Sequence, residues 1–249
     1  MINLFLFLIG IPVSIFINTL ADDLPKRRSL QTPHCPHCHQ PYPLNHWLAW
    51  LSRFQGNCPH CHTPRSTRHL LIEIITPLYF AYLPTLISHP LTLFFITSYI
   101  AILILIIVID MEHFLILHIV TLPTFIFALI GSLIVPASEN TLPLALVGAL
   151  VGFIIFYALY WIGNLLFGEG ALGFGDVTLS TIMGAMLGFD RIFFALFLAV
   201  ILGGLGGLLI LILYRDQNRY MPYGPYLAIA AMIFLLWGKQ IVAPFVAIP

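Results

Sequence analysis

Two aspartates adjoin long apolar segments and have the chemistry of a catalytic pair. Asp110 ends the apolar run of residues 100–109, and Asp176 closes a Gly-Phe-Gly-Asp sequence just before another apolar run. A carboxylate at membrane depth costs about 3 kcal/mol, so one that persists is a candidate functional group. Two neighbouring carboxyl groups in a poorly solvated site do not both ionise easily, and such a pair can activate a water molecule between them. The sequence therefore predicts catalytic roles for Asp110 and Asp176.

The residues around this pair leave one alternative open. Gly173 and Gly175 would let the backbone approach a substrate strand closely. Asp176 could instead cap the helix that follows it. Glu112 lies two residues beyond Asp110, which puts it on another face of a helix. We therefore do not expect Glu112 to join the pair.

The four cysteines form a second set with recognisable chemistry. Each of two Cys-Pro-His-Cys turns carries two of them, and nineteen residues separate the turns: Cys35, Cys38, Cys58 and Cys61. Two such turns can hold four thiolates around zinc, each at about 2.3 Å, and leave no open position for catalysis. The pattern predicts structural zinc. Two disulfides, or ligands drawn from His37, His39, His60 and His62, are the alternatives.

The composition indicates an all-α polytopic membrane protein. The chain is 60% hydrophobic and only 8% charged, and its mean hydropathy is +0.99, whereas about a quarter of the residues in a soluble domain are charged. The formal net charge is zero, and nothing indicates a nucleic-acid partner. About eight transmembrane helices are expected, over residues 2–20, 70–88, 91–110, 117–135, 142–167, 177–189, 192–214 and 223–246. The segment 177–189 is short for a bilayer, which takes about 20 residues.

Three regions follow from this pattern. Residues 1–20 are expected to form the first transmembrane helix, which has no basic residue before it and no clear cleavage site, unlike a signal peptide. Residues 21–69 would be a small cytoplasmic insertion that carries the four-cysteine zinc-binding domain. Residues 70–249 would form a transmembrane domain that carries both aspartates.

The basic residues predict the orientation of the helices, because lysine and arginine concentrate on the cytoplasmic side. With eight crossings only Arg191 and Lys239 fall outside. The other eight lie inside: Lys26, Arg27, Arg28, Arg53, Arg65, Arg68, Arg215 and Arg219. This topology places the zinc module and both aspartates on the cytoplasmic side.

Several short motifs occur in an order that is specific when taken together. Phe16 and Asn18 are followed by Leu24 and Pro25, then by the two cysteine turns. After these come Ser66, Arg68 and Glu73, then Asp110 with the Thr-Leu-Pro of residues 121–123, the Gly-Phe-Gly-Asp of residues 173–176 and the Pro-Tyr-Gly-Pro of residues 222–225. From about Phe16 to Ala231 the chain resembles the bacterial prepilin peptidases, a family of membrane aspartic proteases.

The resemblance implies an activity, partners and a cofactor. Family members cut the basic leader from type IV prepilins or type II secretion pseudopilins at the cytoplasmic face of the bacterial inner membrane. The resemblance assigns Asp110 and Asp176 as the catalytic aspartates, with prepilin substrates and membrane lipid as partners. Many members also methylate the new N-terminus with S-adenosylmethionine, and residues 21–69 are the candidate region for that activity.

The chain departs from the family pattern near both activities. Thr178 replaces a lysine and Leu117-His118 replaces Pro-Asp, at the rim of the expected peptidase site. Ser14-Ile15 replaces Gly-Ser and Asp23 replaces an arginine, and these changes bear on the methyltransferase.

Two other functions remain open from the sequence. One is a transporter in which Asp110 and Asp176 relay protons. The other is a zinc-knuckle membrane adaptor without enzyme activity.

Overall fold

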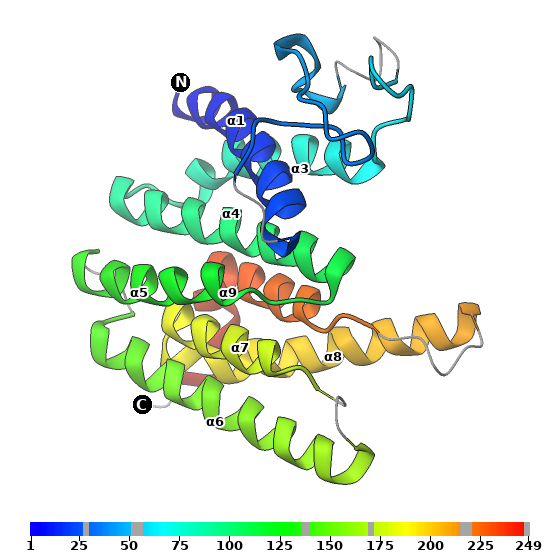
Figure 1. Cartoon of the computed structure of the whole chain (residues 1–249). Helices are drawn as coiled ribbons and strands as arrows, with labels where there is room; N and C mark the ends of the chain where they lie inside the picture. Colours follow the sequence, from blue (N-terminus) through cyan, green and yellow to red (C-terminus); the bar gives the residue numbers. More distant parts are fainter. Residues whose placement is uncertain (27–29, 51–56, 136–139, 169–171, 215–220, 247–249) are drawn as a thin grey trace. The chain divides into compact units, whose positions relative to one another are not determined.

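The computed structural model describes residues 1–26, 30–50, 57–135, 140–168, 172–214 and 221–246, and their regular structure is helical (Figure 1). Among these residues an isolated bridge between His34 and Pro41 is the one β-type pairing. The chain divides into two compact units, Met1–Leu105 and Ile106–Pro249. The predicted all-α fold is confirmed for the described residues.

The first unit is built on a pair of helices. α1 (Ile2–Asp23) and α3 (Thr67–Leu86) pack against each other, and the first part of α4 (Pro90–His113) belongs to the same unit. Gly10 of α1 allows the close approach, because a Cβ atom there would lie 2.5 Å from Cα of Pro77. Between α1 and α3 in the chain lies the cysteine-bearing segment.

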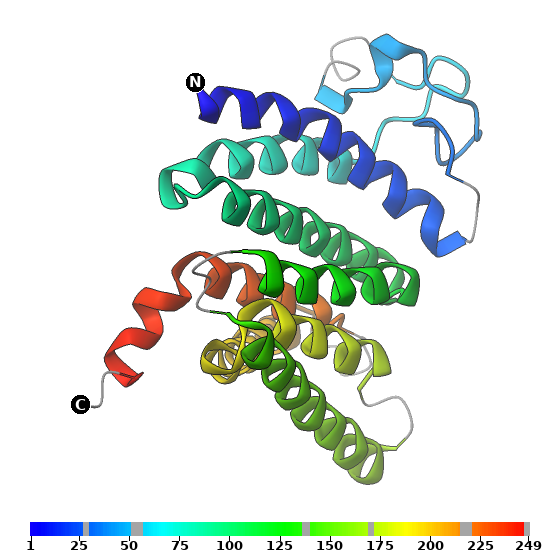
Figure 2. The ribbon, with the colours of Figure 1, turned by 90° about the vertical axis from the view of Figure 1, so that its left-hand side faces the viewer.

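The second unit is organised around a short buried helix. It contains the end of α4, α5 (His118–Ile134), α6 (Leu142–Phe167), α7 (Phe174–Leu187), α8 (Phe189–Tyr214) and α9 (Gly224–Val246). α7 contacts α5, α6, α8 and α9, and nearly all of its side chains after Gly175 are buried. Figure 2 shows α6 crossing beside α7, with the C-terminal end of α9 projecting from this unit.

Small residues bring α6 and α7 into backbone contact. A Cβ atom at Gly184 would overlap the backbone of Gly148, and one at Gly152 would overlap the carbonyl of Ser180. The Ser180 hydroxyl also donates a hydrogen bond to the Gly152 carbonyl, at 3.1 Å. Close contacts of this kind hold helices together where the hydrophobic effect cannot distinguish neighbours from lipid.

A single glycine joins α7 to α8. Gly188 has a φ angle of +79°, which favours glycine, and α8 begins at the next residue. The Asn140 side chain donates hydrogen bonds to the carbonyls of Ala185 and Met186, at 2.8 and 3.0 Å. These contacts satisfy acceptors that a helix end leaves open.

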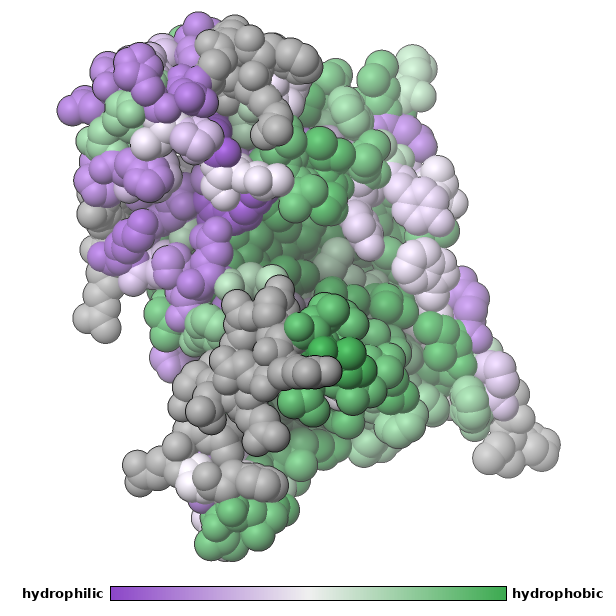
Figure 3. Space-filling view, turned by 90° about the vertical axis from the view of Figure 1, so that its right-hand side faces the viewer, coloured by the Kyte–Doolittle hydropathy of each residue, from purple (hydrophilic) through white to green (hydrophobic). Residues whose placement is uncertain are grey.

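Each of the eight expected helices has a counterpart in the described residues. Six of them are long and apolar enough to cross a membrane, whereas α5 and α7 are shorter. Eight crossings therefore remain a prediction. Figure 3 shows hydrophobic side chains over the helices and hydrophilic side chains gathered near the cysteine-bearing segment. Exposed apolar residues such as Phe197 and Leu209 of α8 suit a lipid environment.

Candidate active site and metal centre

Asp110 is held in the last turn of α4 by the beginning of α9. Its side chain is buried, and the Gly224 N–H donates a hydrogen bond to Asp110 Oδ2 at 3.0 Å. Gly224 is the first residue of α9, so the positive end of the helix dipole faces the carboxylate. A Cβ atom at position 224 would lie 2.6 Å from the same oxygen. The contact therefore requires glycine.

Asp176 lies in the first turn of α7 and is also buried. Gly173 is the N-cap residue of this helix, and its backbone N–H hydrogen-bonds the Asp176 carboxyl group. This is half of a capping box, so the capping alternative from the sequence is present. The Asp176 carboxyl group also lies close enough to Asp110 for their charges to interact. The carboxyl group that caps α7 is therefore also within electrostatic reach of Asp110.

Ile116, in the connection between α4 and α5, packs against both aspartate-bearing regions. A Cβ atom at Gly175 would lie 2.8 Å from Cβ of Ile116, and one at Gly224 would lie 3.3 Å from its Cδ1. Gly175 therefore makes room for Ile116. The expectation that Gly175 leaves space for a substrate strand does not describe this structure.

Tyr223 is a third polar residue at the site. Burial, and then the negative charge of Asp176, raise the pKa of the Tyr223 phenol to about 12. Tyr223 directly precedes Gly224, whose N–H donates to Asp110, so this short segment lies beside the site. The phenol is protonated at any physiological pH.

The four cysteines come together in the first unit. Their sulfur atoms all lie within 4.8 Å of one another. The Cys35 and Cys61 sulfurs are 3.6 Å apart and those of Cys38 and Cys58 are 3.8 Å apart. Tetrahedral zinc with bonds of about 2.3 Å would hold sulfurs about 3.8 Å apart. All four cysteines are free, and among the described residues no histidine joins the cluster.

The two cysteine turns have the same backbone geometry. The N–H of His39 donates to the Cys35 carbonyl, and that of His62 to the Cys58 carbonyl, each at 2.9 Å. Both histidines have a φ angle of 56°. Burial opposes ionisation of the Cys35 thiol, but hydrogen bonds from the backbone of Cys38 and His37 lower its pKa to about 5. Against a backbone hydrogen bond that lowers it, burial and the neighbouring cysteines raise the pKa of Cys38 to about 12. Cys35 is therefore the cysteine whose thiolate, the form that binds metal, is favoured.

Buried ionic contacts attach the cysteine-bearing segment to α3. The Ala49 N–H donates to Glu73 Oε2 at 2.5 Å, and Arg65 lies 3.8 Å from the other oxygen of Glu73. Arg65 also donates to the carbonyls of His46 and Trp47, at 2.7 and 3.1 Å. Glu73 is therefore a polar anchor between the segment and the helix.

A second ionic cluster joins α1 to α3. The Arg68 guanidinium donates to Asp22 Oδ1 at 2.6 Å, and His69 Nε2 lies 3.1 Å from Asp22 Oδ2. Its neighbour Asp23 is fully buried, accepts the Gln31 N–H at 3.0 Å and faces His34 at 3.6 Å. Asp23, which departs from the family pattern, thus ties the end of α1 to the segment that follows.

Comparison with known proteins identifies the family. Residues 97–208 match the model of the type IV leader peptidase family, and residues 8–86 match that of the bacterial peptidase A24 N-terminal domain. A prepilin leader peptidase/N-methyltransferase of Aeromonas salmonicida is 34% identical over 233 residues, covering 87% of this chain and 75% of the relative. The chain belongs to the type IV leader peptidase family.

Other relatives of the same name cover similar lengths. The protein of Aeromonas hydrophila is 32% identical over 231 residues, covering 88% of this chain and 76% of the relative. The protein of Dichelobacter nodosus is 30% identical over 230 residues, covering 90% of this chain and 78% of the relative. No solved structure matches the chain. The family is an aspartic peptidase family, so the chain is an enzyme of that class.

Other polar residues that adjoin the aspartates in sequence are exposed or bond within their own helix. Glu112 is exposed, as its helix position predicts, and His118 is exposed at the start of α5. Thr178 donates to the Gly175 carbonyl at 2.7 Å, so its hydroxyl bonds within its own helix. Glu169, a polar residue near the membrane boundary in sequence, lies outside the described residues. Neither Glu112 nor His118 is buried with the aspartate pair.

Sequence reasoning missed two contributors. From the sequence Tyr223 is only one residue of the Pro-Tyr-Gly-Pro motif, and its place next to Gly224 is the signal that could single it out. Asp22 carried no signal, because an aspartate at a helix end ordinarily faces solvent.

Proposed function

We propose that this chain is a prepilin peptidase, which cuts the basic leader from type IV prepilins or type II secretion pseudopilins at the cytoplasmic face of the inner membrane. The observation that supports it is the convergence of two buried carboxyl groups, from α4 and α7, in a chain of this family. The names of its relatives supply the substrate class.

In this mechanism Asp110 and Asp176 share one proton, and the pair titrates as a unit. The ionised carboxylate takes a proton from the water molecule, whose oxygen attacks the scissile carbonyl carbon. The protonated carboxyl group supplies its proton to the carbonyl oxygen. When the tetrahedral intermediate collapses, the C–N bond breaks, the leaving amine takes a proton from one carboxyl group, and a hydroxyl of the intermediate returns a proton to the other. The Gly224 N–H stabilises negative charge on Asp110 throughout.

Zinc completes the proposal for the first unit. The donor set of four thiols at tetrahedral spacing fits Zn²⁺, with Cys35, Cys38, Cys58 and Cys61 as ligands. Bound zinc would fix the two turns to each other and, with four protein ligands, take no part in hydrolysis.

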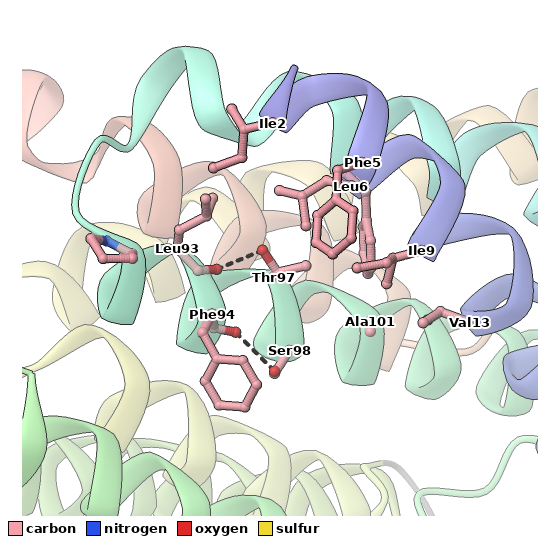
Figure 4. Close-up of a pocket in the computed structure, with 12 residues that line it drawn as sticks. Ile2, Phe5, Leu6, Ile9, Val13, Leu93, Phe94, Thr97, Ser98 and Ala101 are labelled. Atoms are coloured by element: carbon pink, nitrogen blue, oxygen red, sulfur yellow. Dashed lines mark hydrogen bonds between the residues drawn. The ribbon is translucent and has the colours of Figure 1, made fainter.

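N-methylation of the new N-terminus is the second candidate function, favoured by the names of the relatives. One described cavity of the first unit, of about 470 Å³, does not fit S-adenosylmethionine. Apolar side chains line it, and the hydroxyls of Thr97 and Ser98 bond to carbonyls of their own helix (Figure 4). The cofactor would need polar partners that this cavity lacks.

The decisive experiment incubates the purified protein with prepilins from the same genome and identifies new N-termini by mass spectrometry. Asp110→Asn and Asp176→Asn should each abolish cleavage, because an amide cannot accept the proton of water. Glu112→Gln, which changes an exposed carboxylate two residues from Asp110, should cleave normally. Full cleavage by either aspartate variant would overturn the aspartate pair. Proton flux in liposomes without any cleavage would instead favour a transporter. The absence of both activities would favour an adaptor.

Labelled S-adenosylmethionine added to the same reaction tests methylation. Label on the mature N-terminus would support the bifunctional enzyme, whereas cleavage without label would restrict it to the peptidase.

A further inference from the structure

Two glycines of α8, Gly203 and Gly206, leave space for the side chains of Tyr223 and Tyr226 at the start of α9. A Cβ atom at Gly203 would lie 2.5 Å from Cε2 of Tyr223, and one at Gly206 would overlap the Tyr226 hydroxyl. The neighbouring Gly204 has nothing within 4 Å of a Cβ atom. The glycines of α8 thus divide into a face that receives tyrosine rings, with Gly203 and Gly206, and an open face, with Gly204 and Gly207.

The ring of Tyr223 is fixed on three sides. It rests on Gly203, and its centroid lies 6.0 Å from that of the buried Phe156 and 6.4 Å from that of Tyr226. On the chain it adjoins Gly224, the residue that donates to Asp110. This packing orders the ring of the residue that directly precedes the Asp110 contact.

The hydroxyl of Tyr223 differs from that of Tyr226. Tyr226 donates to the sulfur of Met221, at 3.6 Å, whereas Tyr223 makes no side-chain hydrogen bond to any residue that the structure describes. It nevertheless lies near enough to Asp176 to interact with its charge. An ordered, protonated donor without a described partner, beside the proposed reacting groups, is available to a substrate.

We propose that the Tyr223 hydroxyl donates a hydrogen bond to the carbonyl oxygen of the scissile peptide bond. The proposal rests on the proposed peptidase function and adds a substrate-binding residue to it. No bond to Tyr223 forms or breaks, and its proton stays on the phenol. As water adds to the carbonyl carbon, negative charge grows on the carbonyl oxygen until the carboxyl proton is transferred to it. A prepositioned donor stabilises this partly charged transition state more than it stabilises the neutral carbonyl of the ground state.

The first test compares Tyr223→Phe with Tyr226→Phe. Phenylalanine keeps the ring on Gly203 and against Phe156, so only the hydroxyl is lost. Loss of one such donor lowers kcat about 100-fold, and because the bond strengthens in the transition state, KM should change little. Tyr226→Phe removes a hydroxyl three residues away, in the first turn of α9, and should leave kcat near wild type.

The second test moves the hydroxyl without removing it. Gly203→Ala places a methyl group where the Tyr223 ring lies, so the ring must shift and kcat should fall. Gly204→Ala adds the same methyl group to open space one residue away and should cleave normally. The pair controls for the effect of alanine on α8 itself.

The outcomes distinguish the role proposed for Tyr223 from the proposed peptidase function. If Asp110→Asn abolishes cleavage while Tyr223→Phe cleaves at the wild-type rate, the role of Tyr223 is wrong and the peptidase stands. If Tyr223→Phe loses activity but its thermal midpoint falls well below that of Tyr226→Phe, the hydroxyl is structural and the proposal is also overturned. Equal midpoints with a selective loss of kcat support it. Cleavage by the aspartate variants would remove the basis of both proposals.

Discussion

At the scale of residues, the contact between Gly224 and Asp110 shows how little space the site allows. The Gly224 N–H reaches the carboxylate at 3.0 Å only because no side chain stands between them. A helix N-terminus stabilises a nearby carboxylate by about 0.3–1 kcal/mol, and more where it is partly buried. This backbone donor therefore holds the Asp110 carboxylate in place.

Gly224→Ala should reduce prepilin cleavage at least tenfold. The new methyl group would lie 2.6 Å from Asp110 Oδ2, so the carboxylate must turn away and lose its hydrogen bond. Initial rates on a prepilin measure the effect. Gly207→Ala, on the open face of α8, is the matched control. An unchanged rate in Gly224→Ala would show that this hydrogen bond does not position the carboxylate.

The candidate aspartates and cysteines could be predicted because their chemistry is conspicuous in an apolar chain. A carboxylate in apolar surroundings costs free energy, and four cysteines in two identical turns have the spacing of metal ligands, so both sets indicate a function. Ile116 and Tyr223 could not be predicted in the same way, since an isoleucine or tyrosine in an apolar chain is ordinary. Only the distances from Ile116 to Gly175 and Gly224 show that it packs against the site.

At the scale of elements, the start of α7 shows that a hydrophobic pattern does not predict where a helix begins. The hydrophobic run predicts a helix from residue 177, but α7 begins at Phe174 and Asp176 lies inside its first turn. Glycine has a low helix propensity, and here the Asp176 carboxyl group and the Gly173 N–H supply the cap. Tertiary and capping contacts therefore extended the helix beyond its apolar pattern.

The backbone contact between α6 and α7 should be sensitive to a single methyl group. Gly184→Ala would overlap Gly148, and overpacking of this kind costs about 1–3 kcal/mol. We expect a lower thermal midpoint in detergent, measured by circular dichroism. Gly204→Ala should keep the wild-type midpoint. Equal midpoints for the two variants would contradict the close packing of α6 on α7.

The cysteine turns should depend on metal as a unit. Cys35→Ser or Cys58→Ser should reduce bound zinc, measured by elemental analysis, from about one ion per chain toward zero, because a structural site needs all four ligands. His37→Ala, next to the cluster, should keep its zinc. Retention of zinc by both serine variants would exclude the tetrathiolate site.

At the scale of the whole molecule, the composition and the helices describe a multi-pass membrane protein. The fold class followed from composition, because so apolar a chain of this length has no soluble alternative. The number of crossings does not follow as simply. α5 and α7 have 17 and 14 residues, and a full crossing takes about 20.

Reporter fusions test whether α7 crosses the bilayer, as a topology with eight crossings requires. With eight crossings, a reporter placed after Gly188 should lie on the outer side, and one placed after Arg68 should lie in the cytoplasm, as the positive-inside rule requires. A cytoplasmic signal after Gly188 would mean that α7 does not cross the bilayer.

The one-residue link at Gly188 has a mechanical consequence. With no loop to absorb a twist, α7 and α8 cannot rotate independently, and Asn140 fastens the end of α7 from outside. α7 carries Asp176, while α8 carries the seat of Tyr223. We therefore expect the two helices to move together. A motion that admits a peptide is then expected on the opposing side, where the α4–α5 connection packs Ile116 against Gly175 and Gly224.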